Sequence, residues 1–316
     1  MSKYKFERTV NAEFSGISLR ALLSEKWLLP RKFIHFLRIR ENVKINGNYY
    51  PMNTIVQGNQ KIELIFEGNE FRTATSNYIV DKGRKIPIIF ENEDLLVVNK
   101  PQGIKSHPNQ PYETGTLMNY IAGYLDVKDE HPYMVHRLDM LTSGAMIVAK
   151  NPVVVPILTR LISTHTIKRD YLAVTEGIFD QKEGVIDLPI GKDENDKRKR
   201  KVDGIGALPA RTHYQVIKEF GNNSVVYLRL ETGRTHQLRV HLSAMGHPIV
   251  GDVLYNHVSE EKHMMLHGYK QKLTLPFSMR ELELKADIPE YFANYEEKIK
   301  ENKKLKEKLY GKLDRK

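Results

Sequence analysis

Two hydrophobic periodicities divide the chain. Apolar residues recur at helical spacing over 18–29 and again over 31–40, where basic residues alternate with them. Residues 42–50 place an Asn-Gly pair between two short extended runs, which is the strongest local signal of a β-hairpin. A further strand-like run follows at 60–68. These elements predict a small α/β unit over residues 1–75.

The pattern changes after a polar, turn-rich stretch that predicts a linker over residues 76–85. Many strands with few helices then predict an α+β domain over 86–288, built on a large, mostly antiparallel sheet. The last segment, 289–316, is expected to be a charged helix or tail. Helices are expected over 116–125, from Asn151-Pro152 onward, and over 235–245. Strands are expected over 86–91, 95–99, 169–179, 184–191, 210–220 and 223–233.

Composition is that of an ordinary globular protein, and the length suggests two domains, or one large domain with an appendage. The chain has 316 residues, of which 41% are hydrophobic and 28% are charged, so a sizeable core is expected. No apolar run is long enough to span a bilayer, and the first residues lack the apolar segment of a secretory signal, so we expect a cytoplasmic protein without membrane partners. The absence of cysteine excludes a disulfide framework, a thiolate zinc site and a cysteine nucleophile.

The formal net charge of +10 favours a polyanionic partner. Composition supports equally well a soluble protein that is merely basic. The basic helix over 31–40 beside a hairpin suits contact with an RNA backbone, although a solvated charged face explains it as well. Five consecutive basic residues at 197–201 leave the same choice between an RNA-facing loop and a solvated hairpin tip.

Candidate chemistry gathers where a charged segment enters an apolar strand. His136, Arg137 and Asp139 stand almost side by side immediately before the run Ala145–Ala149. A carboxylate held there is a candidate for catalysis, while the plain alternative is that Asp139 caps the turn 139–144. The twelve histidines show no metal-ligand spacing, so we expect no metal site.

Four ordered segments resemble the motifs of the RluA-type pseudouridine synthases. They lie within residues 85–285. Residues 1–75 resemble an S4-type RNA-binding domain, with a leucine-rich helix, a basic helix and an Asn-Gly turn that follows Ile45. The four segments are NKPQGIKSHP (99–108), VHRLDMLTSGAMIVAK (135–150), IKRDYLAVTEG (167–177) and GRTHQLRVHLSAMGHPIVGD (233–252).

This resemblance implies an α+β pseudouridine synthase fold and a defined reaction. The family isomerises selected uridines in structured RNA to pseudouridine, so the expected partner is RNA, either 23S ribosomal RNA or tRNA. It needs no metal, nucleotide or redox cofactor, and we expect a monomer.

The resemblance also implies roles for three residues. Asp139 is the expected catalytic carboxylate, and three routes stay open: attack at C6 of uracil, attack at the sugar anomeric carbon, or action as a base at the ribose. Arg239 is expected to keep that carboxylate ionised, with Arg234 as the competing choice. Tyr171 offers a stacking face for a flipped uracil, and its hydroxyl could help to remove the C5 proton.

Three further residues are expected on the substrate side of the site. Arg137 is expected to fill or brace the gap that a flipped uridine leaves, or else to bind a phosphate. His136 and Lys100 are grouped with it, and the Lys-Pro-x-Gly loop that starts at Lys100 is expected to brace the loop of Asp139. Phe277-Ser278 departs from the family pattern, so no role is assigned there.

Two rival functions differ from an isomerase. A non-catalytic RNA-binding or ribosome-assembly factor could share the fold, but it would be free to lose Asp139 or Arg239, and both are present. A hydrolase of the glycosidic bond would normally need a second carboxylate as its acid, which the four motifs do not supply.

Overall fold

The computed structural model describes residues 4–73, 76–298 and 301. Within the predicted C-terminal segment 289–316 it shows a short helix, α6 (Glu290–Ala293), and helical residues 295–298. The rest of that prediction lies outside the described residues. No helix of the described part of the chain is both long enough and apolar enough to cross a membrane.

The N-terminal unit is a four-stranded sheet covered by two helical segments. The sheet order is β1-β4-β2-β3, and the predicted hairpin is present, with Asn46 and Gly47 both at positive φ in its turn. The first predicted helix begins as α1 (Leu19–Ala21) and continues as a π-helical turn to Lys26. The basic helix is α2 (Arg31–Ile39). The strands are β1 Tyr4–Thr9, β2 Val43–Ile45, β3 Asn48–Tyr49 and β4 Lys61–Phe66.

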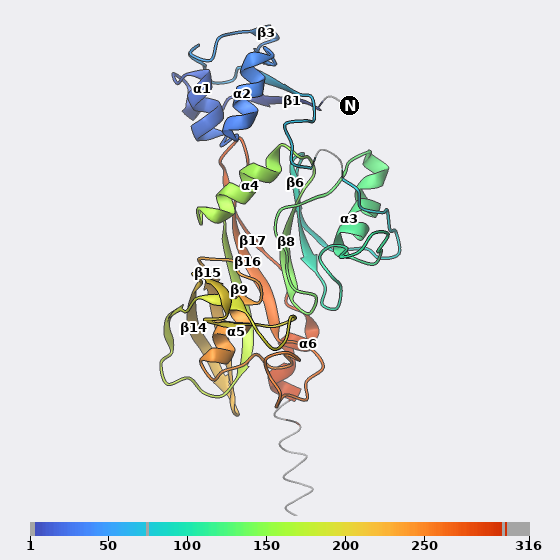
Figure 1. The fold of residues 1–316 in the computed structure, drawn as a ribbon, viewed down its shortest axis with the longest axis vertical. Coiled ribbons are helices and arrows are strands. Elements are labelled where there is room, and N and C mark those ends of the chain that lie inside the picture. Colours follow the sequence, from blue (N-terminus) through green and yellow to red (C-terminus); the bar gives the residue numbers. More distant parts are fainter. Residues whose placement is uncertain (1–3, 74–75, 299–300, 302–316) are drawn as a thin grey trace, which may run out of the picture.

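The larger unit is built on a ten-stranded sheet, as the sequence predicted. Eight strands follow the order β10-β14-β15-β9-β16-β8-β6-β5, with β17 beside β16 and β7 beside β8. Figure 1 labels β14, β15, β9, β16, β17, β8 and β6 of this sheet. All pairs are antiparallel except β16 with β8. The strands are β5 Ile88–Glu91, β6 Leu95–Lys100, β7 Tyr133–Met134, β8 Ser143–Ala149, β9 Lys168–Glu176, β10 Glu183–Asp187, β14 Arg211–Phe220, β15 Asn223–Leu230, β16 Leu266–Thr274 and β17 Glu281–Lys285.

Three helices accompany this sheet: α3 (Leu117–Leu125), α4 (Val154–Ser163) and α5 (Gln237–Ala244). The start of α4 is later than predicted. The N-cap residue is Val153, so Asn151 and Pro152 both lie before the helix, although Asn151 Oδ1 accepts a hydrogen bond from the Val154 amide (3.1 Å). The basic run 197–201 belongs to a small sheet of β11 (Ile190–Lys192), β12 (Arg200–Val202) and β13 (Ile205–Leu208).

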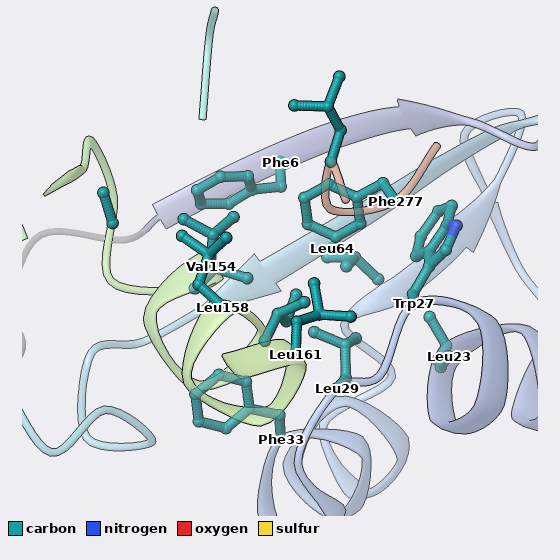
Figure 2. Close-up of a cluster of buried hydrophobic side chains, with 14 of the residues drawn as sticks. Phe6, Leu23, Trp27, Leu29, Phe33, Leu64, Val154, Leu158, Leu161 and Phe277 are labelled. Carbon is teal, nitrogen blue, oxygen red and sulfur yellow. The ribbon is translucent and has the colours of Figure 1, made fainter. Parts of the chain in front are cut away.

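One apolar core joins the two units. It contains residues of the N-terminal sheet and helices together with Val154, Leu158 and Leu161 of α4 and with Phe277 from the turn between β16 and β17. Figure 1 shows α4 between the N-terminal unit and the large sheet, and Figure 2 shows these side chains around Phe6, Phe33 and Leu64. Trp27 meets Phe277 edge to face, with ring centroids 5.3 Å apart.

Arg8 adds a polar contact to this junction. Its guanidinium lies over the Phe277 ring, 5.1 Å from the centroid, and its Nη2 is 2.5 Å from Asp94 Oδ1 at the start of β6. Both charged side chains are largely buried. Phe277, to which the sequence assigned no role, is therefore the residue of the larger unit that Trp27 and Arg8 share.

We expect Phe277→Ala to lower the free energy of unfolding by about 3–5 kcal/mol, because it leaves a cavity beside a fully buried Trp27. Trp27 is the chain's one tryptophan, so its fluorescence during denaturant unfolding reports on this junction directly. The control is Tyr112→Ala, which truncates a ring that is 90% exposed and should leave the transition in place. An unchanged midpoint for the Phe277 variant would show that the junction adds little to stability.

Candidate active site

Asp139 lies in the turn that leads from β7 into β8. Its carbonyl accepts a hydrogen bond from the Thr142 amide (3.1 Å), and every residue of β8 is buried. Gly144 has a φ of +117° and runs against Gly268 of β16, where a Cβ would be 2.3 Å from the Gly268 carbonyl oxygen. The Thr-Ser-Gly sequence after Asp139 therefore allows the two strands to approach closely, which fixes the start of β8.

The Asp139 loop is held from the neighbouring strand end at β6. Lys100 Nζ donates hydrogen bonds to the carbonyls of Met140 (3.2 Å) and Thr142 (2.8 Å), and Gln102 Nε2 donates to that of Leu141 (2.7 Å). Lys100 is fully buried, and burial lowers its pKa to about 7 against the opposing charge of Asp139. Its ammonium faces these carbonyls, so the structure does not place Lys100 where RNA would contact it.

Arg239 bridges two carboxylates. Its Nε and Nη2 each donate to Asp252 at 2.7 Å, and its Nη1 donates to Asp139 Oδ2 at 3.1 Å. Burial disfavours the guanidinium charge, but hydrogen bonds and attraction from Asp252 and Asp139 outweigh it and raise the Arg239 pKa. Asp252 is fully buried, whereas the Asp139 side chain keeps 19% of its surface exposed. The contacts of Arg239 and His236 with Asp139 both involve Oδ2, and Oδ1 of Asp139 accepts no hydrogen bond from any other described residue.

Sequence reasoning missed Asp252. Its only signal was its position at the end of the long motif 233–252, after the apolar pair Ile249-Val250 and Gly251. Its Oδ1 also accepts hydrogen bonds from the amides of Leu254 (3.0 Å) and Tyr255 (3.2 Å). These amides hold the Asp252 carboxylate in place, and the carboxylate holds the Arg239 guanidinium through two hydrogen bonds.

The helix that carries Arg239 is largely buried. Every residue of α5 from Gln237 to Leu242 is buried, and Arg239 also lines the cleft that contains Asp139, so it is not a surface arginine. The competing Arg234 donates its Nε to the Pro209 carbonyl (3.0 Å) and makes no contact with Asp139. The choice of Arg239 over Arg234 therefore agrees with the geometry.

Tyr171 comes from β9 and lines the same cleft as Asp139. The side chain is buried, and its hydroxyl bonds to no other described residue. Burial raises the pKa of Tyr171, so the phenol is neutral at physiological pH. The residues that line the cleft include Arg137, Asp139, Arg169, Tyr171, Arg234, His236 and Arg239.

Arg137 and His136, both predicted on the substrate side, have different environments in the structure. Arg137 is exposed at the cleft, and its guanidinium pairs with no other described side chain. His136 turns inward instead, where its Nε2 accepts a hydrogen bond from the Ile147 amide (3.0 Å) and burial lowers its pKa to about 3. His136 therefore anchors β8. His236, for which no role was predicted, places Nε2 3.7 Å from Asp139 Oδ2.

Comparison with known proteins assigns the chain to a class. Residues 94–244 match the family model of RNA pseudouridylate synthases, and residues 6–62 match that of the RluD ribosomal pseudouridine synthase N-terminal domain. The chain is 34% identical over 288 residues to the uncharacterized RNA pseudouridine synthase YhcT of Bacillus subtilis, which covers 90% of this chain and 93% of that protein. It is 35% identical to the ribosomal large subunit pseudouridine synthase D of Nitrosomonas europaea, over 91% of this chain and 86% of that protein.

A solved structure agrees. Human RNA pseudouridylate synthase domain containing 1 superposes with a TM-score of 0.57 and 28% identity, over 68% of this chain and 89% of that one. The chain belongs to the RNA pseudouridine synthases, with the α+β fold of that family. It is an isomerase that converts uridine in RNA to pseudouridine. The assignment favours the enzyme over a non-catalytic RNA-binding factor.

We expect Asp252→Asn to reduce kcat for pseudouridine formation by about 10²-fold, because an amide cannot accept both guanidinium hydrogen bonds and Arg239 then shifts. Loss of one partner from a buried pair should also cost on the order of 3 kcal/mol of stability. Single-turnover kinetics at saturating RNA and a thermal melt measure both effects.

The matched control is Asp196→Asn, which removes the carboxylate of a solvent-exposed pair with Arg198 and should leave turnover and melting unchanged. Full activity of the Asp252 variant would show that Arg239 holds its position without that carboxylate.

Proposed function

We propose that this enzyme modifies uridine in large-subunit ribosomal RNA. Support comes from relatives in Nitrosomonas europaea and Haemophilus ducreyi that are named ribosomal large subunit pseudouridine synthase D, and from the match of residues 6–62 to an N-terminal domain of the same name. We further propose that it acts in the cytoplasm, and as a single chain, because one chain already brings Asp139, Tyr171 and Arg239 to one cleft.

In our proposal Asp139 starts the reaction, and the bridge from Asp139 through Arg239 to Asp252 is the observation that supports it. The isomerisation breaks the bond between C1′ and N1, turns the uracil, and joins C1′ to C5. A proton leaves C5 and one is gained at N1, so substrate and product contain the same atoms. Attack at C6, attack at C1′ and proton removal from the ribose all use the Asp139 carboxylate, which the Arg239 guanidinium orients through its hydrogen bond to Oδ2.

We assign the uracil-stacking role to Tyr171. Its buried ring lines the cleft that Asp139 opens into, and a base taken out of its helix gains stacking energy on such a surface. The raised Tyr171 pKa disfavours a phenolate, which supports the ring rather than the hydroxyl as the working group. Arg137, exposed at the same cleft without a partner, is the proposed brace for the gap that the uridine leaves.

We expect Asp139→Asn to abolish turnover while RNA affinity stays within about threefold of the wild type, because the amide has nearly the same shape but cannot act as nucleophile or base. Purified protein and variant are incubated with total RNA from a host that lacks the gene. Carbodiimide labelling with reverse-transcription stops then locates each new pseudouridine.

This experiment tests the substrate RNA and the role of Asp139 independently. New stops in large-subunit ribosomal RNA that vanish with the variant support both the substrate and the residue. Stops confined to tRNA would overturn the substrate, and stops that persist with the variant would overturn Asp139.

For the N-terminal unit, residues 1–75, we propose RNA-backbone binding, with 86–288 as the catalytic domain. Arg31 and Arg38 of α2 line one cleft together with Arg20 and with Arg160 of α4, and none of these guanidinium groups pairs with another described side chain. Several unpaired cations around one cleft suit the phosphates of RNA. The cleft crosses the junction between the units, which places the basic helix at a fixed position relative to α4.

We expect the double variant Arg31→Gln, Arg38→Gln to weaken RNA binding by about tenfold at physiological salt and to lower the salt slope of log K by about 1.5, because two phosphate contacts are lost. Filter binding across a salt series measures this. Deleting residues 1–75 is a poorer test, because it would expose the apolar face of α4.

The control variant, Lys182→Gln with Lys218→Gln, removes the same charge from β14 and its neighbouring loop, where each lysine already pairs with a glutamate. If both double variants lost the same amount of salt slope, the effect would come from net charge alone, and the proposal that the cleft beside α2 binds RNA would be contradicted.

A further inference from the structure

Strand β9 presents two opposite charges to two opposite faces of the sheet. Side chains alternate along a strand, so Arg169 and Tyr171 share one face, and Lys168 and Asp170 share the other. Asp170 pairs across the sheet with Arg229 of β15, with Oδ1 2.7 Å from Arg229 Nε. The acidic neighbour of Arg169 is therefore paired on the far side of the sheet, and it does not serve Arg169 as a counter-ion.

Arg169 lines the Asp139 cleft as a half-buried guanidinium without an acidic partner among the described residues. The nearest catalytic carboxylate, Asp139, is already engaged by Arg239. The charge of Arg169 is nevertheless felt within the site, where it lowers the pKa of His136 and opposes the rise that burial causes in the pKa of Tyr171. A partly desolvated cation of this kind is stabilised when an anion enters the cleft.

The chain makes room for this guanidinium at Gly233. A Cβ at that position would stand 3.2 Å from Arg169 Nη2 and 3.6 Å from Nη1, so the planar group rests against the bare glycine backbone. Gly233 has no need of glycine for its own backbone conformation, because its φ is not positive. The structural reason for a glycine at position 233 is therefore the close approach of the Arg169 guanidinium.

We propose that Arg169 binds a backbone phosphate of the nucleotide whose base stacks on Tyr171. This inference rests on the stacking role proposed for Tyr171. Residues i and i+2 of a strand lie roughly 6.6 Å apart, which is comparable to the separation of a base from its own phosphate. The planar fork of an arginine matches two phosphate oxygens at once, which a point charge cannot do. Arg169 and Tyr171 together would hold one nucleotide by both ends.

The test uses full-length enzyme and in vitro-transcribed large-subunit ribosomal RNA. We expect Arg169→Gln to raise KM by about tenfold or more with kcat within about threefold, since a phosphate contact holds ground state and transition state alike. The salt slope of log K for RNA should fall by about 0.7–0.9, the value of one phosphate. Arg169→Lys keeps the charge but loses the planar fork of the guanidinium. Its KM and salt slope should lie between those of the wild type and those of Arg169→Gln.

Lys168→Gln is the matched control. It removes the same charge from the adjacent position of the same strand, but from the opposite face, and it should leave KM, kcat and salt slope unchanged. Gly233→Ala provides a second variant that keeps the arginine. Its methyl group displaces the guanidinium by a few tenths of an ångström, so we expect a KM increase of about two- to threefold that disappears in the Arg169→Gln background.

Two outcomes would overturn the proposal. A fall in kcat with unchanged KM and salt slope would mean that Arg169 acts on Tyr171 or Asp139 electrostatically. An equal effect of Lys168→Gln would mean that net charge alone matters. The affinity measurements are repeated in the Asp139→Asn background, where binding is read without turnover. Failure of the Asp139 assignment would then appear as residual pseudouridine formation, whereas failure of the Arg169 assignment would appear as unchanged RNA affinity.

Discussion

A buried guanidinium held between two carboxylates is the interaction on which the site depends. Arg239 makes two hydrogen bonds to the fully buried Asp252 and a third to Asp139, which is partly open to solvent. An ion pair removed from water gains little net energy unless its geometry is good and its remaining donors are used. Here the geometry is bidentate on one side, so the arginine is fixed before RNA arrives. If Asp139 starts the reaction as proposed, its carboxylate meets a positive charge that needs no rearrangement during catalysis.

The loop that carries Asp139 is also held in place before RNA binds. Three consecutive carbonyls of that loop accept hydrogen bonds from Lys100 and Gln102, and His136 anchors the following strand from beneath. Each of these side chains makes its hydrogen bonds to the protein backbone and so supports the loop rather than contacting the substrate. A carboxylate that must reach one atom of one nucleotide gains from such support, because small misplacements carry large kinetic penalties.

Local patterns predicted the elements well and the long-range contacts poorly. The hairpin at Asn46-Gly47, the basic helix and the strand that follows Asp139 all have short-range signals, and the structure contains them. Asp252 and the inward turn of His136 depend on partners more than ten residues away, which no periodicity encodes. Lys100 looks like a substrate ligand in sequence because lysine is rarely fully buried. The family resemblance supplied Asp139, Arg239 and Tyr171, and the geometry brings these three to one cleft.

The shared core at the junction has a consequence for the order in which the chain can fold. Trp27 and Phe277 are 250 positions apart (277 − 27), yet their rings touch. A ribosome that adds about 5–20 residues per second needs roughly 12–50 s to make that span. During this interval the N-terminal unit has emerged, with its sheet and both helical segments complete, while Leu29 and Phe33 still lack the α4 residues, and Trp27 still lacks Phe277. The apolar surface that packs on α4 therefore stays exposed until about half of the chain has been made, and the part of Trp27 that meets Phe277 stays exposed until almost all of it has been made.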